Sequence, residues 1–162
     1  MIATNEKIWQ ILEQVKDPEI PVLTVIDMGI IRDIKADDDK VEVIITPTYS
    51  GCPAMNMIEV EIKATLQENG FQNPKVTTVL SPAWTTAWLS EEGRKKLKAY
   101  GIAPPVESSN DKNVLFQDEK EVQCPQCDSL NTKLVSQFGS TPCKSLYKCN
   151  NCLEPFDYFK CH

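Results

Sequence analysis

The stretch VEVIITPTYSGCPAMNMIEVEIKATLQENG (residues 41–70) places a strand, a corner and a helix in direct succession. Its apolar run at 41–45 is typical of a strand. From Pro53 onward, apolar residues recur every three or four positions until Gly70, which predicts a helix over residues 53–69 with the glycine as its stop. Cys52 lies at the corner between the two elements. The stretch therefore predicts a helix packed on a sheet.

Similar patterns on both sides extend this unit. Apolar spacing predicts a helix over residues 6–15, which Pro18 ends because the residue before a proline avoids the helical region. Two strands around an acidic turn predict a hairpin over residues 29–46. We expect a short strand at 75–80, and a helix at 90–100 whose acidic start and basic end suit the helix dipole. The predicted fold is α/β (α+β), a small two-layer domain of helices on a mixed sheet.

The regular pattern fades after Gly101. Residues 104–120 are rich in Pro, Ser and Asn and are typical of a linker, although VLFQ within them is compatible with a short strand. We expect residues 1–103 to form a first domain and residues 121–162 a second, smaller one. A segment of roughly 40 residues buries too little apolar surface to fold without a staple, that is, a cross-link such as a bound metal ion or disulfide bonds.

That staple is visible as two cysteine pairs, CPQC (124–127) and CNNC (149–152), separated by 21 residues. Two residues between cysteines let both thiolates bind one ion, and two such turns supply a tetrahedral four-sulfur site. The residues between the pairs alternate around FGST, which indicates a hairpin. We therefore predict a C-terminal zinc ribbon with Cys124, Cys127, Cys149 and Cys152 as ligands. A single iron or an iron–sulfur cluster is the alternative occupant.

Other residues of this second segment give weaker signals. Cys143 is expected to be a buried or half-buried thiol of the hairpin, and Cys161 to belong to a frayed end, although it is also a possible ligand. A docking surface is more in keeping with the ribbon than nucleic-acid binding, because its lysines are scattered. Its candidate anchors, with the ribbon's own core as the alternative, are Phe156, Tyr158 and Phe159.

Composition and charge exclude several classes of protein. The net charge of −6 disfavours nonspecific binding to nucleic acid. No apolar run approaches the roughly 20 residues needed to cross a bilayer, and the N-terminus does not resemble a secretory signal, so we expect a cytoplasmic protein without a membrane span. The only histidine is His162. This excludes a Ser-His-Asp hydrolase, and a zinc hydrolase built on several histidines, in the body of the fold.

Cys52 stands apart from the other cysteines. Proline is favoured in the first helical turn, so Pro53 puts Cys52 near the N-cap, where backbone N–H groups and the helix dipole stabilise a thiolate. We expect a lowered pKa for Cys52; the alternative is an inert cysteine packed under the corner. A thioredoxin-like pair, a phosphatase loop and a histidine base are all missing around it. A lone thiolate that binds a soft metal or cluster transiently is what remains.

Acidic residues are further candidates for that site. Asp17 and Glu19 lie in DPEIP, and Asp27 lies in a similar turn with Met28 and Gly29. Each is a carboxylate beside apolar residues, so each is able to belong to a functional site. The alternative for each is a cap or a turn.

Four motifs of the chain are DPEIP (17–21), DMGII (27–31), TPTYSGCP (46–53) and LSPAWTTAWLSEEGRKKL (80–97). Together they resemble the small domain of the SufT-like iron–sulfur assembly factors over about residues 5–105. With the ribbon, including FGSTPCKSLYKC and EPFDYFKCH, nearly the whole chain resembles the PaaD family of bacterial phenylacetate degradation. The resemblance implies a role beside the multicomponent phenylacetyl-CoA epoxidase, and it places the family's reactive cysteine on Cys52 and its acidic turn on Asp17 and Glu19.

The residues and the resemblance lead to one hypothesis and two rivals. The chain lacks the histidines of a di-iron oxygenase, a GxGxxG segment and a plant-type ferredoxin cysteine set. We therefore expect a non-catalytic accessory protein that helps to assemble or insert a cluster in an epoxidase component, with Cys52 as a transient ligand and a homodimer as one way to complete the shell. The rivals are a structural subunit that stabilises the oxygenase, and a redox enzyme that acts through Cys52.

Overall fold

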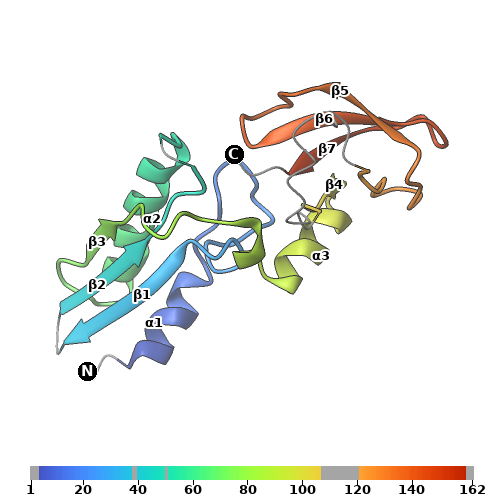
Figure 1. Cartoon of the computed structure of the whole chain (residues 1–162). Helices are drawn as coiled ribbons and strands as arrows, with labels where there is room; N and C mark the ends of the chain where they lie inside the picture. Colours follow the sequence, from blue (N-terminus) through green and yellow to red (C-terminus); the bar gives the residue numbers. More distant parts are fainter. Residues whose placement is uncertain (1–3, 38–39, 50, 107–120, 160–162) are drawn as a thin grey trace. The chain divides into compact units, whose positions relative to one another are not determined.

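The computed structural model describes residues 4–37, 40–49, 51–106 and 121–159. The chain divides into two compact units, Met1–Gly93 and Arg94–His162. Figure 1 gives their helices and strands. The VLFQ segment, which is compatible with a short strand, lies outside the described residues, as does most of the acidic turn of the hairpin.

The first unit contains a three-stranded mixed sheet with strand order β1-β2-β3. β1 and β2 are antiparallel, and β2 and β3 are parallel because α2 connects them in a β-α-β crossover. A mixed sheet with helices, as predicted, is confirmed. The elements in chain order are α1 (Asn5–Leu12), β1 (Ile31–Asp37), β2 (Lys40–Ile45), α2 (Ala54–Glu68), β3 (Lys75–Thr78), the 3-10 helix η1 (Thr86–Trp88) and α3 (Glu91–Ala99), which continues across the boundary between the units.

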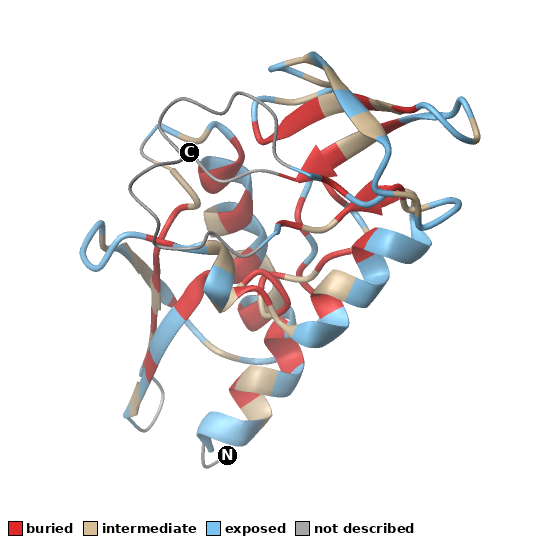
Figure 2. Ribbon diagram, turned by 45° about the vertical axis from the view of Figure 1, so that its right-hand side comes forward, coloured by how far each residue is buried: buried red, intermediate tan, exposed pale blue. Residues whose placement is uncertain are grey.

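The core of the first unit lies between the sheet and two helices. α1 packs against α2 and β1, and α2 packs against β3. Along β2 every second residue is buried, as expected for a strand with one face on the core. Figure 2 shows the buried faces of the helices in red. Each fully buried large aliphatic side chain here contributes about 1.5–3 kcal/mol. The helical members of this core are Ile8, Ile11, Leu12, Ile58, Ile62 and Leu66.

The two helices end for different local reasons. α1 stops at Leu12, three residues earlier than the apolar pattern predicts. Val15 is nevertheless buried, because the Val25 N–H donates to its carbonyl and draws the chain into an extended pair instead of a further helical turn. α2 ends as predicted at Gly70, whose φ of 94° is in the left-handed region. The Gly70 and Phe71 N–H groups donate to the last carbonyls of α2.

The second unit is built on a four-stranded sheet with strand order β4-β7-β6-β5. β5 (Thr132–Ser136) and β6 (Lys144–Cys149) form the predicted antiparallel hairpin, and β7 (Pro155–Phe159) pairs with β6. β4 (Ile102–Ala103) pairs in parallel with β7. No strand was predicted at residues 102–103, which the expected domain boundary leaves in the first domain. In the structure both residues are buried and belong to the sheet of the ribbon.

The aromatic residues of β7 are core residues of the second unit. Phe156 and Tyr158 are each 4% exposed and Phe159 is 1% exposed. Tyr147 of β6 stacks on Phe156 and contacts Tyr158 edge-on. The hypothesis that these three aromatic residues anchor a partner is therefore wrong, since a segment of this size needs them for its own core.

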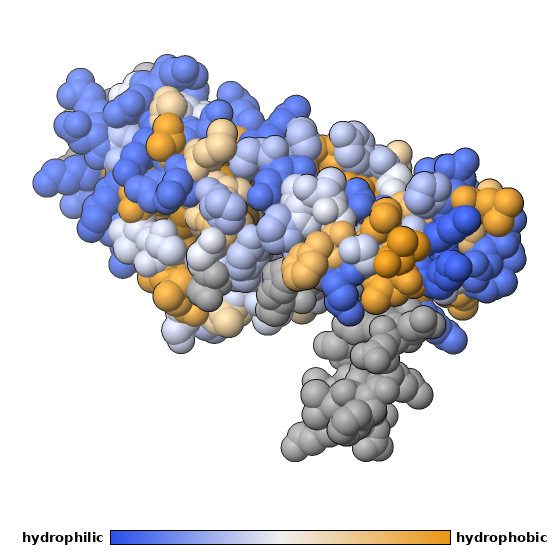
Figure 3. Space-filling model, turned by 90° about the horizontal axis from the view of Figure 1, so that it is seen from above, coloured by the Kyte–Doolittle hydropathy of each residue, from blue (hydrophilic) through white to orange (hydrophobic). Residues whose placement is uncertain are grey.

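Some large apolar side chains remain on the surface of each unit. Figure 3 shows one face, on which apolar residues form separate orange patches among hydrophilic ones. Single exposed apolar residues are normal on a protein surface, so only those that share one face of an element need an explanation. The most exposed in the first unit are Met57, Val60 and Leu80, and those in the second unit are Tyr100, Val106, Leu130, Val135, Phe138 and Leu153.

Candidate functional site

The four paired cysteines of the second unit lie within reach of one ion. Their Sγ atoms are all within 4.8 Å of one another, with separations of 3.7 Å for Cys124–Cys152 and 3.5 Å for Cys127–Cys149. A tetrahedral site with Zn–S bonds of about 2.3 Å requires Sγ–Sγ separations of about 3.8 Å, whereas a disulfide requires about 2.0 Å. The sulfur positions therefore fit a four-thiolate metal site.

Each cysteine pair is held by the same kind of turn. In the first pair, the Cys124 N–H donates to the Ser129 carbonyl, and Asp128 has a φ of 61°. In the second pair, the Cys149 N–H donates to the Glu154 carbonyl, and Leu153 has a φ of 65°. In both turns the fourth residue after the first cysteine thus adopts the left-handed conformation. This reversal folds the chain back so that both sulfurs point to one place.

The two asparagines of CNNC join the second turn to the first. Asn150 Nδ2 donates to Asn131 Oδ1 at 3.0 Å, and the Asn150 N–H donates to the Asn131 carbonyl at 2.9 Å. Asn151 Nδ2 donates to Ser129 Oγ at 2.7 Å. Reasoning from the cysteines alone missed these residues. The signal that could have found them is the polar, turn-forming character of both residues between the cysteines.

Cys127, Cys149 and Cys152 differ in how readily their thiols lose a proton. The Cys152 N–H donates to Cys149 Sγ at 3.5 Å and is the main cause that lowers the pKa of Cys149 to about 6. At Cys152 the Glu154 N–H lowers the pKa, but desolvation and the neighbouring thiols outweigh it and raise the pKa to about 12. At Cys127 the Ser129 N–H is outweighed in the same way, so its pKa is raised. A metal ion must therefore displace protons from Cys127 and Cys152.

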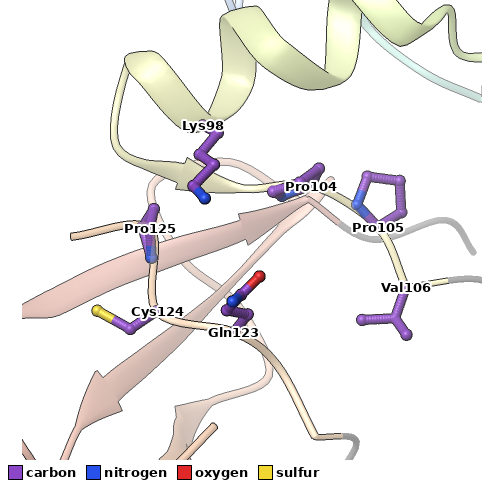
Figure 4. A pocket seen from close by; sticks show the side chains of 7 residues that line it. All are labelled: Lys98, Pro104, Pro105, Val106, Gln123, Cys124 and Pro125. Atoms are coloured by element: carbon purple, nitrogen blue, oxygen red, sulfur yellow. The ribbon is translucent and has the colours of Figure 1, made fainter. Parts of the chain in front are cut away.

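A small cavity lies beside the first cysteine pair. Its volume is about 200 Å³, and Figure 4 shows three proline rings and Val106 around it. Its one cationic group, Lys98 Nζ, forms a salt bridge with Asp128 Oδ1 at 2.5 Å. The cavity thus offers apolar walls and a lysine that is already paired, and nothing in it selects a ligand. The lining residues are Lys98, Pro104, Pro105, Val106, Gln123, Cys124 and Pro125.

In the first unit, three motif loops meet at one end of the sheet. The Thr46 N–H, at the start of the TPTYSGCP loop, donates to the Ile30 carbonyl just before β1. The Val79 N–H, just after β3, donates to the Ile45 carbonyl at the end of β2. This end carries the carboxyl ends of the two parallel strands, where sites are commonly formed in α/β sheets. The N-terminus of α2, and with it Cys52, is at this end because α2 returns from it to β3.

The loop that follows β3 packs on the DMG turn (27–29). Trp84 Nε1 donates to the Met28 carbonyl at 2.7 Å, and the Ser90 N–H donates to the Asp27 carbonyl at 2.8 Å. Gly29 has a φ of 67°, and a Cβ added to it would lie 2.3 Å from the Trp88 carbonyl oxygen. Only glycine fits this position. The two tryptophans therefore have a structural role that the sequence pattern did not indicate.

The carboxylates of Asp17 and Asp27 accept hydrogen bonds from backbone N–H groups of their own turns. Asp17 is 6% exposed, and its Oδ1 accepts hydrogen bonds from the Glu19 and Ile20 N–H groups at 2.7 and 2.8 Å. Asp27 is 7% exposed and accepts from the Thr24 N–H and from Ser90 Oγ. Asp17 thus forms an Asx-type turn, and Asp27 forms a capping box with Thr24, whose Oγ1 accepts from the Asp27 N–H. A turn or a cap is the structural alternative that the sequence allowed. Glu19 is half-buried.

Cys52 is a half-buried free thiol one residue before the N-cap of α2, which is Pro53. Its N–H donates to the Tyr49 carbonyl at 3.3 Å, and its own carbonyl accepts from the Met55 N–H at 3.2 Å. The thiol was expected at about the N-cap and lies just outside it. Thr46, at the base of the same loop, is 1% exposed, and its Oγ1 is a buried side-chain oxygen with no hydrogen-bond partner among the described residues.

Comparison with known proteins identifies both halves of the chain. Residues 5–80 match the family of iron–sulfur cluster assembly proteins, and residues 108–160 match the PaaD zinc β-ribbon domain. The chain is 46% identical over 155 residues to an Escherichia coli K12 protein named as a subunit of a "Putative 1,2-phenylacetyl-CoA epoxidase", and the match covers 96% of this chain and 92% of that protein. It is 33% identical over 98 residues to an Fe-S protein maturation auxiliary factor of Porphyromonas gingivalis, and this match covers 59% of this chain and 92% of that protein.

Two solved structures resemble the first part of the chain. A domain of unknown function from Bacillus anthracis has 27% identity and a TM-score of 0.54, and the match covers 57% of this chain and 89% of that chain. A conserved hypothetical protein from Thermotoga maritima has 31% identity and a TM-score of 0.50, with coverage of 59% and 94%. Fold and cysteines thus define an iron–sulfur assembly domain joined to a metal-binding ribbon. With the near full-length relative, this combination shows that the chain belongs to the PaaD family.

The lengths and polarity of the helices bear on membrane insertion. Within the described ranges, every helix is too short or too polar to span a membrane.

Proposed function

We propose that this chain is a non-catalytic accessory protein of a phenylacetyl-CoA epoxidase, and that it assists the assembly or insertion of an iron–sulfur cluster in a component of that enzyme. Two similarities support the proposal. The near full-length relative is named as an epoxidase component, and the first unit alone matches maturation auxiliary factors. The six cysteines among the described residues are thiols and not disulfides, which suits a reducing cytoplasm, where we place the protein.

The observation that carries the proposal is the position of Cys52. Its thiol is half-buried rather than sealed in the core, and it lies at the end of the sheet where the TPTYSGCP, DMG and SPAW loops meet. It is also outside the four-cysteine cluster. A single thiolate holds iron more weakly than a closed four-sulfur shell, and weak binding suits a cluster that has to move on.

The transfer itself is an exchange of ligands. A thiol of the acceptor loses its proton and forms an Fe–S bond, while the bond between iron and Cys52 Sγ breaks and the Cys52 thiolate takes up a proton. No electron changes hands, so the step needs no reductant. Asp17 and Glu19 belong to this proposal as the acidic turn of the family, with Asp17 acting through the turn that it caps. Other ligands come from the acceptor or from a second copy of the chain.

The ribbon has a different part in the proposal. Its four thiolates bind zinc, which closes the coordination shell and leaves no open position for chemistry. We propose that the zinc stabilises the second unit and that this unit positions the oxygenase or reductase component. A single iron in the same shell would give a coloured protein, so metal analysis and a visible spectrum of anaerobically purified protein separate the two metals.

The test of the proposed function is Cys52→Ala in cells that express the complete epoxidase system. We expect the reductase component to be purified with a lower content of cluster iron and sulfide, and epoxidation to fall with it. Purified wild-type protein added during anaerobic reconstitution should restore the cluster. Unchanged cluster content and unchanged epoxidation with Cys52→Ala would contradict the proposal.

A structural subunit that stabilises the oxygenase is the second candidate, favoured by the metal-stapled ribbon itself. It predicts stable co-purification with the oxygenase. It also predicts that ribbon substitutions abolish activity, whereas Cys52→Ala has no effect. The two candidates therefore differ in the result of one substitution.

A further inference from the structure

One side of α2 presents apolar side chains to solvent instead of to the core. Met57 is 59% exposed and Val60 is 66% exposed. Pro53, Met57, Val60 and Ala64 are spaced by four, three and four residues, so they share one face of the helix. Pro53 is exposed and Ala64 half-buried. We name these four residues the α2 strip.

The α2 strip is not explained by packing within its unit. The core side of the same helix is made by Met55, Ile58, Ile62 and Leu66, all of which are buried. The strip is therefore a second apolar face of a helix whose first face is already used. Methionine adapts its shape to different surfaces, which suits a contact that forms and separates.

The strip begins at the residue that follows Cys52. At a rise of about 1.5 Å per residue, Val60 lies only about 12 Å along the helix from Cys52. A weak, transient protein contact buries about 600 Å² on each partner, which is a patch roughly 28 Å across. A protein that brings its own thiols to iron held at Cys52 therefore also covers Met57 and Val60.

Charge indicates the chemistry of that partner. Residues 1–93 contain 7 Lys and Arg against 15 Asp and Glu, a net of −8. On α2, Glu61 is exposed beside the strip, while Glu59 is paired with Lys63 at 2.6 Å. An apolar contact with an acidic rim fits a partner whose own apolar patch has a basic rim.

The geometry points to the α2 strip as the docking surface for the protein that accepts the cluster from Cys52, with Met57 and Val60 as the apolar contacts and Glu61 as the rim charge. This inference rests on the proposed function, because it takes Cys52 as the ligand that gives up the cluster. It adds the place where the acceptor binds.

The experiment measures cluster transfer between purified proteins. Full-length chain, reconstituted anaerobically with iron and sulfide, is mixed with the apo form of the epoxidase reductase component, and the spectrum of the reductase is followed. Met57→Glu with Val60→Glu is expected to lower the transfer rate about tenfold, since removal of central apolar contacts commonly has an effect of this size. Glu61→Lys should also lower the rate and should weaken its dependence on salt.

The far end of α2 offers a charge-matched control. Gln67 and Gln72 are exposed, and Gln67 lies about 22 Å along the helix from Cys52, outside a contact patch centred on that residue. Gln67→Glu with Gln72→Glu adds the same number of charges and should leave the rate unchanged. Met57→Ser with Val60→Thr removes the apolar contacts without charge and should lower the rate in the same direction. Far-UV circular dichroism of each variant checks the fold.

The outcomes separate this inference from the function on which it rests. If Cys52→Ala abolishes transfer but the strip variants transfer at the wild-type rate, the docking inference is wrong and the proposed function stands. If Cys52→Ala transfers normally, the proposed function fails. If the chain is a dimer that the strip variants convert to monomers without loss of transfer, the strip pairs two copies and the inference is overturned.

Discussion

The four-cysteine site and the Cys52 corner place the same kind of side chain in contrasting surroundings. In the ribbon, four sulfurs lie within 4.8 Å of one another and two of their residues, Cys124 and Cys149, are fully buried. At the corner, one half-buried sulfur lies in a loop that is fixed by neighbouring loops of the same sheet end. A closed shell holds its ion and shapes the chain, whereas a single open ligand allows its cargo to leave.

The largest expected effect follows the loss of a ribbon cysteine, which should unfold the second unit and leave the first unit folded. Metal binding contributes roughly 10–16 kcal/mol to folding in small zinc modules, so loss of one ligand should unfold most of a unit of this size. We expect Cys124→Ser to expose residues beyond about 121 to limited proteolysis, while the first unit keeps its protected fragment. Loss of the first unit's fragment as well would show that the two units depend on a common core.

Acid should weaken metal binding in the ribbon steeply. The raised pKa values of Cys127 and Cys152, the latter about 12, mean that both thiols release protons when the ion binds near neutral pH. Affinity should therefore fall by at least about a hundredfold for each unit of pH lost. Below pH 6 Cys149 also becomes protonated and the fall steepens. Competition with a chelator at pH 6, 7 and 8 measures this slope, and a flat profile would contradict the thiol assignment.

The sequence predicts more of the four-cysteine site than of the Cys52 corner, and the reason is physical. The ribbon ligands follow from short spacings, because a tight turn brings two cysteines together whatever the rest of the fold does. The hairpin between the pairs, β5 and β6, was predicted for the same local reason. The register that sets Thr132 opposite Cys149 brings the two turns together, and this depends on the whole hairpin.

The surroundings of Cys52 depend on contacts that are distant in sequence. The bond from Trp84 to Met28 and the approach of Trp88 to Gly29 link loops more than 50 residues apart. No periodicity or spacing reveals such contacts. The burial of all three aromatic residues of β7 has a similar cause, since it requires β4 and β6 on either side of that strand.

Gly29→Ala tests the packing that shapes the corner. The added Cβ would lie 2.3 Å from the Trp88 carbonyl oxygen, and φ is 67°, so we expect a loss of about 3 kcal/mol or more in the free energy of unfolding. Gly70→Ala is the matched control. Its φ is 94°, but nothing lies within 4 Å of an added Cβ, so only about 1–2 kcal/mol of backbone strain is expected. Urea unfolding of both variants gives the difference, and equal losses would mean that the DMG turn does not hold the SPAW loop closely.

The smallest expected change in stability is at the corner cysteine itself. Cys52 is half-buried, so Cys52→Ala should lower the free energy of unfolding by less than about 1 kcal/mol and leave the metal content of the ribbon unchanged. Cys143→Ala is the comparison, because Cys143 is 7% exposed and lies 3.1 Å from Thr141 Oγ1, and its loss should cost about 1–2 kcal/mol. If Cys52→Ala proves the more damaging of the two in urea unfolding, Cys52 is a packing residue, and its thiol is not available to hold a cluster.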